Sequence, residues 1–242
     1  MLEKLNADFY HAKQKDGLIV TALKLLDADK TILDIGAGQM PYKKYCRHLK
    51  YVSQDFCKYD GEGDGKGIQT VTFNTDQIDI ACDITNIPVE SSSFDAILCT
   101  EVLEHVIEPN SAIKEMTRIL KPGGVLIITV PGTSLLHFSP YHYFTGFKCN
   151  YFYELLSEKN FKDLSVVRVG NIYTISALYV WYIVEKISKS ILPRMNKLLF
   201  KFLIMGTSPF VLMLLLLGRM SKIDPETIEA GVFVIGTKKC ES

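Results

Sequence analysis

The chain has 242 residues, enough for one domain with a sizeable hydrophobic core. Its 27 lysines and arginines balance its 27 aspartates and glutamates, so charge gives no reason to expect nucleic acid as a partner. Its six cysteines are scattered without a C-x-x-C pair, which predicts reduced thiols rather than disulfides or a zinc site.

The first predicted elements are a helix over about residues 7–26 and an apolar strand that ends at a glycine motif. Asp34 stands near the end of this strand, and Gly36 and Gly38 follow it. Glycine at such a turn allows positive φ and lets the backbone approach a ligand closely. The third glycine of a dinucleotide-binding motif is replaced by Pro41, so the motif does not predict an NAD site.

Three further strand-like runs follow, and each ends at an acidic residue. They cover residues 51–55, 78–84 and 93–100, and they lead to Asp55, Asp83 and Glu101. Parallel strands present their carboxyl ends at one edge of the sheet, which is where open α/β sheets bind ligands. We therefore expect Asp34, Asp55 and Asp83 to gather at that edge.

The remaining elements alternate between helices and strands. They are a helix at 111–120 stopped by the residues 121–124, a strand at 125–130, a sixth strand at 164–169 and a last strand at 231–237. Helices are also expected between the first and second strands and between the third and fourth. Such alternation predicts an α/β protein with a doubly wound, mostly parallel seven-stranded sheet and helices on both faces.

Four motifs in this order resemble the class I S-adenosylmethionine-dependent methyltransferases. They are LDIGAG at 33–38, SFDAI at 93–97, EVLEH at 101–105 and LKPGG at 120–124. The resemblance covers about residues 30–131, and more loosely 135–237, and includes enzymes of the polysaccharide-biosynthesis type. It implies a Rossmann-like methyltransferase fold, methyltransferase activity and S-adenosyl-L-methionine as the cofactor.

The cofactor-binding residues expected on this basis are Asp34, Gly36, Gly38, Asp55, Asp83, Ile84, Thr100 and Glu101. An ionised carboxylate accepts hydrogen bonds only, so Asp55 suits the two ribose hydroxyls. By the resemblance, Asp83 accepts from the adenine amine beside the Ile84 amide, and Glu101 borders the methyl-transfer side. The polar residue Gln54 departs from the family, which more often has an apolar residue before this acid.

The sequence predicts no metal site. Acids alternate with glycines at 60–67, but the twelfth position of a calcium loop would be Val71 instead of glutamate. The rest of the chain shows no metal-ligand spacing, so a magnesium-dependent mechanism is not favoured.

A segment rich in histidine and aromatic residues, 136–147, follows the fifth strand and is the candidate acceptor site. A hydroxyl acceptor can require a general base. His142 is the first candidate for this catalytic role, followed by His137 and His105. The alternative is that these histidines only pack the junction between loop and helix.

Residues 171–228 are expected to be an apolar helical insertion into a methyltransferase domain of residues 1–170 and 229–242. Residues 171–184 and 202–217 carry no charge, and each run is shorter than the ~20 residues that span a bilayer. Basic residues flank both runs, which favours peripheral contact with an anionic membrane surface. A homodimer interface or a cap over the domain is the alternative, and membrane spanning is the least favoured. No basic segment followed by an apolar run opens the chain, so we expect no secretion and a cytoplasmic protein. Membrane contact through the insertion would place it at the inner face of the cell membrane.

The sequence thus predicts a methyltransferase, most simply one that methylates oxygen on a glycan, lipid-linked or isoprenoid-type acceptor. Two alternatives stay open. One is an enzyme for a soluble small molecule that dimerises through the insertion. The other is a catalytically silent cofactor-binding module that recruits partners.

Overall fold

The computed structural model describes residues 10–156, 161–191, 206, 209–217 and 229–240. The chain divides into two compact units. One contains Lys15–Arg168 and Gly231–Ser242, and the other contains Met1–Gln14 and Val169–Ala230.

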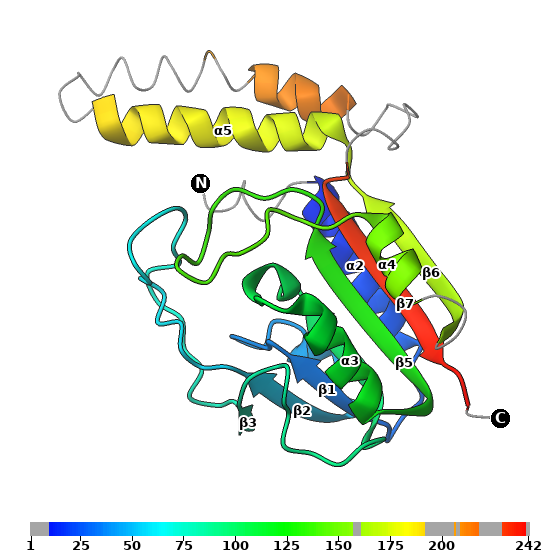
Figure 1. Cartoon of the computed structure of the whole chain (residues 1–242). Coiled ribbons are helices and arrows are strands. Elements are labelled where there is room, and N and C mark those ends of the chain that lie inside the picture. Colours follow the sequence, from blue (N-terminus) through cyan, green and yellow to red (C-terminus); the bar gives the residue numbers. More distant parts are fainter. Residues whose placement is uncertain (1–9, 157–160, 192–205, 207–208, 218–228, 241–242) are drawn as a thin grey trace. The chain divides into compact units, whose positions relative to one another are not determined.

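A seven-stranded sheet forms the larger unit (Figure 1). Its strands are β1 (Thr31–Ile35), β2 (Lys50–Asp55), β3 (Ile80–Ala81), β4 (Phe94–Thr100), β5 (Leu120–Pro131), β6 (Phe161–Val169) and β7 (Gly231–Lys238). Their order is β3-β2-β1-β4-β5-β7-β6. All pairs from β3 to β5 are parallel, whereas β7 runs antiparallel to β5. The predicted α/β class with a doubly wound, mostly parallel sheet of seven strands is confirmed.

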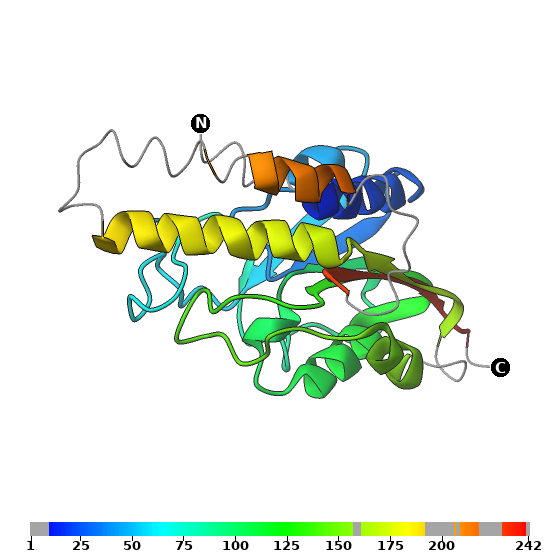
Figure 2. The same cartoon turned by 90° about the horizontal axis from the view of Figure 1, so that it is seen from above.

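Helices cover both faces of this sheet. The helices are α2 (Tyr10–Lys24), α3 (Pro109–Ile119) and α4 (Cys149–Leu155), with single 3₁₀ turns η1 (Lys43–Tyr45) and η2 (Leu103–His105). Figure 2 shows α2 on one side of the sheet and α3 and α4 on the other. The core on the α3 side includes Leu33 and Ile97 of the sheet, Met116 of α3 and Phe152 of α4.

The sequence of α3 accounts for its bounds and its packing. Pro109 stands in the first turn, where its missing N–H costs nothing. Ala112, Ile113, Met116 and Ile119 are buried, and their spacing places them on one side of the helix facing the sheet. The helix ends because Leu120 is extended, and β5 begins there rather than at residue 125. Residues 121–124 form an irregularity within β5. On β4, Phe94 pairs with Leu120 and Ala96 already pairs with Val125, so these four residues of β5 have no regular partners.

Three predicted elements are shorter than expected or missing. Only η1 stands between β1 and β2, and residues 82–93 between β3 and β4 contain no helix, so both predicted helices there are wrong. The third strand contains only two residues, Ile80 and Ala81, and the side chain of Asp79 bonds to β2 just before it. The carboxylate of Asp79 accepts from the N–H and the hydroxyl of Ser53 on β2, at 2.8 and 2.7 Å, in place of a regular ladder.

The second unit contains α5 (Ile172–Ile191) and a second helical segment at residues 209–217. The two lie side by side, in yellow and orange in Figure 1. Ala177 and Leu214 are buried between them, while Phe210 and Leu212 are exposed. Within the described part of the chain, no helix is both long enough and apolar enough to cross a membrane.

Candidate active site

A cavity of about 530 Å³ opens where the strands β1, β2 and β4 end. Its volume lies within the roughly 300–1,000 Å³ typical of small-molecule sites. The cavity is lined by Gly36 and by the polar residues Gln54, Asp55, Lys58, Asp83, Thr85, Glu101, His105 and Glu108. The aromatic lining residues are Phe56, Tyr59, Phe73, Phe138, Tyr141 and Tyr143. The cavity therefore occupies the edge at which a parallel sheet binds ligands.

Asp55, the last residue of β2, is held at the cavity by backbone amides. One carboxylate oxygen accepts from the N–H of Gly38 at 3.0 Å, and the other accepts from the N–H of Cys57 at 2.9 Å. An ionised carboxylate has about four acceptor positions. After these two bonds, the buried group can still accept two hydrogen bonds from a ligand.

Gln54, which sequence reasoning treated as a departure, joins two walls of the cavity. Its Oε1 accepts from the N–H of Gly36 at 3.3 Å, and its Nε2 donates to the carbonyl of Cys82 at 2.7 Å. An apolar side chain could make neither bond. The buried polar residue in a strand was the available signal, since such groups are nearly always hydrogen-bonded.

Both glycines of the motif have left-handed backbone, with φ of +63° at Gly36 and +50° at Gly38. A Cβ at Gly36 would lie 2.3 Å from Cγ2 of Val102, and one at Gly38 would lie 2.6 Å from Cζ of Phe73. Any larger residue would therefore combine backbone strain with a steric clash.

Asp34 does not line the cavity. Its side chain is almost fully buried and accepts a hydrogen bond from the hydroxyl of Tyr51 at 2.5 Å. Burial raises the pKa of Asp34 to about 7, although the Tyr51 hydrogen bond opposes this shift. The structure therefore places Asp34 in a partly buried hydrogen bond that links β1 to Tyr51 of β2.

Asp83 and Ile84 line the cavity in the segment after β3. The Oδ1 atom of Asp83 accepts from the N–H and the hydroxyl of Thr85 at 2.8 and 2.7 Å. These bonds hold the pKa of Asp83 below its usual value, so the group is an ionised acceptor at neutral pH.

Glu101 lies just beyond β4 with a φ of +54°, and it lines the cavity. Its Oε2 forms an ion pair with Nζ of Lys15 on α2 at 2.8 Å. Thr100, the preceding residue, is half-buried in β4 and is not part of the lining.

The three candidate histidines form one cluster, although only His105 lines the cavity. The ring of His137 lies 4.7 Å from that of His105 and 4.5 Å from that of His142. Nδ1 of His105 lies 2.7 Å from the carbonyl of Tyr141, and Nδ1 of His137 lies 2.8 Å from that of Leu135. A carbonyl only accepts, so Nδ1 carries the hydrogen in both rings and Nε2 of the neutral ring keeps its lone pair.

Burial keeps these imidazoles neutral. It lowers the pKa of His105 to about 4, and it also lowers the pKa of His137 and of His142. Nε2 of His142 is 3.1 Å from the hydroxyl of Ser134, which gives this ring a partner away from the other two.

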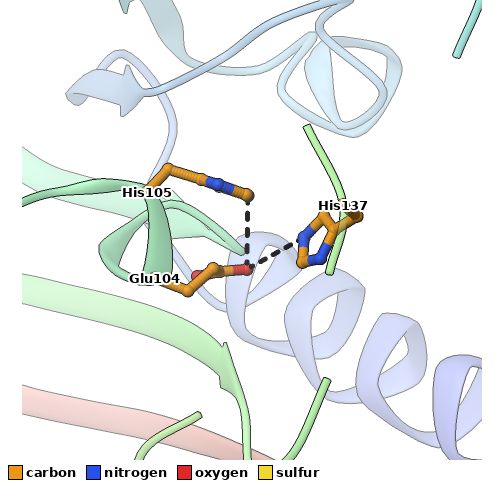
Figure 3. A group of neighbouring side chains, drawn as sticks. All are labelled: Glu104, His105 and His137. Atoms are coloured by element: carbon orange, nitrogen blue, oxygen red, sulfur yellow. Dashed lines mark ion pairs between the residues drawn. The ribbon is translucent and has the colours of Figure 1, made fainter. Parts of the chain in front are cut away.

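The buried carboxyl of Glu104 lies between two of the histidines (Figure 3). Its Oε1 is 3.7 Å from Nε2 of His105 and 4.0 Å from Nε2 of His137. Burial raises the pKa of Glu104 well above its usual value. Sequence reasoning missed Glu104 because His137 stands on a distant loop, so no spacing along the chain reveals the group.

Comparison with known families identifies a methyltransferase domain over residues 33–128, which spans β1 to most of β5. This region contains all the polar lining residues named above, from Gln54 to Glu108.

Curated relatives match over short segments. The chain is 49% identical to the demethylmenaquinone methyltransferase of Paenarthrobacter aurescens over 49 residues, which are 20% of this chain and 19% of that protein. It is 48% identical to the ubiquinone biosynthesis O-methyltransferase of Xanthomonas oryzae over 40 residues, 16% of this chain and 17% of that protein. It is 34% identical to the human protein named Probable tRNA methyltransferase 9B over 102 residues, 41% of this chain and 21% of that protein. The chain thus spans about a fifth of the length of these relatives.

Solved structures extend the likeness of fold to nearly the whole chain. Phosphoethanolamine N-methyltransferase 2 of Haemonchus contortus, solved with S-adenosyl-L-methionine, has a TM-score of 0.51 at 16% identity, over 94% of this chain and 53% of that one. A methyltransferase solved with the Trm112 activator of Haloferax volcanii has a TM-score of 0.57 at 11% identity, over 98% of this chain and 93% of that one. At such identities the likeness establishes the fold alone.

Proposed function

Since residues 33–128 are a class I S-adenosylmethionine-dependent methyltransferase domain, we propose that the chain transfers the methyl group of this cofactor to an oxygen atom of an isoprenoid-type, lipid-linked or glycan acceptor. The observation that carries the proposal is the cavity at the strand ends, which is lined by Gly36, Asp55 and Asp83. In chain order, these residues suit the methionine part, the ribose and the adenine of the cofactor.

The residues present fit S-adenosyl-L-methionine. Asp55 has two acceptor positions left for the ribose hydroxyls, and ionised Asp83 suits the adenine amine beside the N–H of Ile84. Gly36 lines the cavity, and a glycine there suits close approach of the backbone to the methionine part. When bound, the cofactor supplies an electrophilic methyl group on a sulfonium.

The protein's own task is to align the acceptor. In-line displacement depends on holding the acceptor oxygen close to the methyl carbon and in line with the carbon–sulfur bond that breaks. Among the three candidate histidines His105 alone lines the cavity, so its position best suits contact with an acceptor. A catalytic role for His142, the first candidate from the sequence, or for His137 remains a prediction. Their rings lie 5.8 and 4.7 Å from that of His105.

The lining of the cavity supports an apolar acceptor over a highly charged one. Six aromatic side chains line it, and aromatic walls favour flat or isoprenoid groups. Two of the curated relatives are named a demethylmenaquinone methyltransferase and a ubiquinone biosynthesis O-methyltransferase, and menaquinone and ubiquinone carry isoprenoid tails. The exposed apolar residues at 209–217 further support peripheral membrane contact, with a homodimer interface as the alternative use.

Calorimetric titration with S-adenosylhomocysteine tests the cofactor site. We expect micromolar binding by the wild type and at least about 10-fold weaker binding by Asp83→Ala, since a hydrogen bond to a charged group contributes roughly 1.5–3 kcal/mol. Asp27→Ala, which removes an exposed acid outside the cavity lining, is the matched control and should bind like the wild type. If the folded wild type does not bind, the proposed function is wrong.

The acceptor is tested with the same protein and radiolabelled cofactor. Short-chain isoprenoid phenols or quinols, free sugars and detergent-solubilised lipid-linked sugars are offered in parallel. Label transfer to the isoprenoid compounds alone supports the favoured acceptor class, and transfer to free sugars alone contradicts it.

A further inference from the structure

We propose that Glu104, His105 and His137 bind a divalent transition-metal ion of the zinc type at the edge of the cavity. Its use in catalysis, as a binding point for the acceptor oxygen, rests on the methyl transfer proposed above. The binding of the metal itself rests only on the side chains drawn in Figure 3.

The three ligand atoms are already close to one another. One ligand atom from each residue can be chosen so that all lie within 4.8 Å of one another, and Oε1 of Glu104 is 3.7 and 4.0 Å from the two Nε2 atoms. With zinc–ligand bonds of about 2.1 Å, a tetrahedral site separates its ligand atoms by roughly 3.4 Å. The site therefore needs only a small inward movement of the side chains.

Hydrogen bonds do not account for the close approach of these three side chains. Both carboxylate oxygens of Glu104 and Nε2 of His105 are buried, and they have no hydrogen-bond partner among the described residues. The distances from Oε1 to the imidazoles exceed the roughly 3.2 Å limit of a good hydrogen bond. Leaving a carboxyl buried and unpaired is costly, and a cation would remove that cost.

The imidazoles are oriented as metal ligands are. In both rings Nδ1 donates to a backbone carbonyl, which fixes the tautomer and leaves Nε2 free to ligate. Such an outer hydrogen bond is the usual companion of a metal-bound histidine. His142 is not counted as a ligand, because its Nε2 contacts the hydroxyl of Ser134.

The donor set indicates the class of metal. Magnesium and calcium prefer all-oxygen sites, whereas imidazole nitrogens suit zinc, iron, cobalt and nickel. Three protein ligands leave a fourth position open, as in catalytic zinc sites. Because His105 lines the cavity, the fourth position is available to a ligand that enters there.

An acceptor hydroxyl at that position would become a better nucleophile. A metal lowers the pKa of an oxygen that it binds, so the hydroxyl loses its proton to water more readily. The acceptor oxygen then forms a bond to the methyl carbon as the carbon–sulfur bond breaks. The electron pair of that bond remains on sulfur, and the products are the methyl ether and S-adenosylhomocysteine.

The test titrates the full chain, stripped with a chelator, with Zn²⁺ by calorimetry and with Co²⁺ by visible absorption. We expect one ion per chain and the ligand-field bands of Co²⁺ bound to nitrogen and oxygen. Glu104→Gln and His137→Gln should each weaken binding by more than about 100-fold, since changes outside the ligand shell alone cost roughly 10–100-fold. His48→Gln removes a histidine outside the cluster and should bind as the wild type does.

Absence of Co²⁺ bands in the wild type, or equal binding by Glu104→Gln, His137→Gln and the wild type, would overturn the proposal. Circular dichroism and urea unfolding confirm that each variant is folded. Binding of S-adenosylhomocysteine by the metal-free chain is measured separately. A failed cofactor site and a failed metal site thus give different results.

Discussion

The side-chain oxygen of Gln54 accepts a hydrogen bond from the backbone N–H of Gly36 at 3.3 Å, so a residue of β2 holds the glycine turn after β1. The same amide donates to the carbonyl of Cys82 at 2.7 Å, in the segment that leads to Asp83. One buried side chain therefore fixes two parts of the cavity wall relative to each other.

Replacing Gln54 with alanine should weaken both stability and cofactor binding. Both of its backbone partners lose a buried hydrogen bond, which costs about 1–3 kcal/mol for each group left unpaired. Urea unfolding measures the loss of stability, and titration with S-adenosylhomocysteine measures the loss of affinity. Gln77→Ala, at an exposed position, should change neither. A Gln54→Ala protein with unchanged affinity would show that the two walls are held without this side chain.

Gly36 and Gly65 allow backbone strain to be separated from steric clash. Both have positive φ, +63° and +73°, but a Cβ at Gly65 meets nothing within 4 Å while one at Gly36 meets Val102 at 2.3 Å. Gly65→Ala should therefore cost only the strain, about 1–2 kcal/mol. Gly36→Ala should cost a further 1–3 kcal/mol or so of overpacking and should abolish micromolar binding of S-adenosylhomocysteine. Equal unfolding free energies for the two variants would contradict this account.

The sheet and its binding edge could be predicted from sequence because their signals are local. Apolar runs that end in Asp55 and Asp83 define strand ends, and the topology of a parallel sheet brings strand ends together whatever lies between them. The absence of a helix from the two crossovers could not be predicted in this way. Alternation favours a helix in each crossover, but side-chain bonds such as that of Asp83 to Thr85 hold residues 82–93 in turns instead.

The proximity of Glu104 to two of the candidate histidines could not be predicted from the sequence, for a different reason. Glu104 and His105 sit on a 3₁₀ turn after β4, and His137 sits on the loop after β5. Their proximity depends on the path of that loop, where Tyr143 and Phe144 donate backbone hydrogen bonds to the carbonyl of Glu104. Contacts of this kind leave no periodic pattern in the sequence.

Lys238 offers a change that should affect stability alone. From the end of β7 its Nζ donates to the carbonyls of Thr117 and Leu120, both at 2.8 Å, and so caps the C-terminal end of α3. Lys238→Met should lower the unfolding free energy by about 1–3 kcal/mol. Its affinity for S-adenosylhomocysteine should equal that of the wild type, because Lys238 is not part of the cavity lining. Lys114→Met, an exposed position on α3, is the matched control, and an equal loss of stability there would contradict the capping role.

Asp34 should make the stability of the chain depend on pH in an uncommon direction. Its folded pKa is raised from 3.8 to about 7, so the folded state binds the proton more tightly than the unfolded state does. Its contribution therefore favours folding most below about pH 4, declines as pH rises from about 4 to 7, and stays low above that range. A shift of this size corresponds to on the order of 4 kcal/mol, since each pKa unit is 1.36 kcal/mol.

The variant Asp34→Asn isolates this effect, because an amide oxygen can still accept from the hydroxyl of Tyr51 but does not titrate. Urea unfolding of both proteins, without cofactor, at steps between pH 4 and pH 8 gives the difference in unfolding free energy. The variant should gain stability relative to the wild type as pH rises to about 7, and the difference should then level off. Parallel curves would mean that Asp34 titrates at the same pH in the folded and unfolded chains, in which case burial does not raise its pKa.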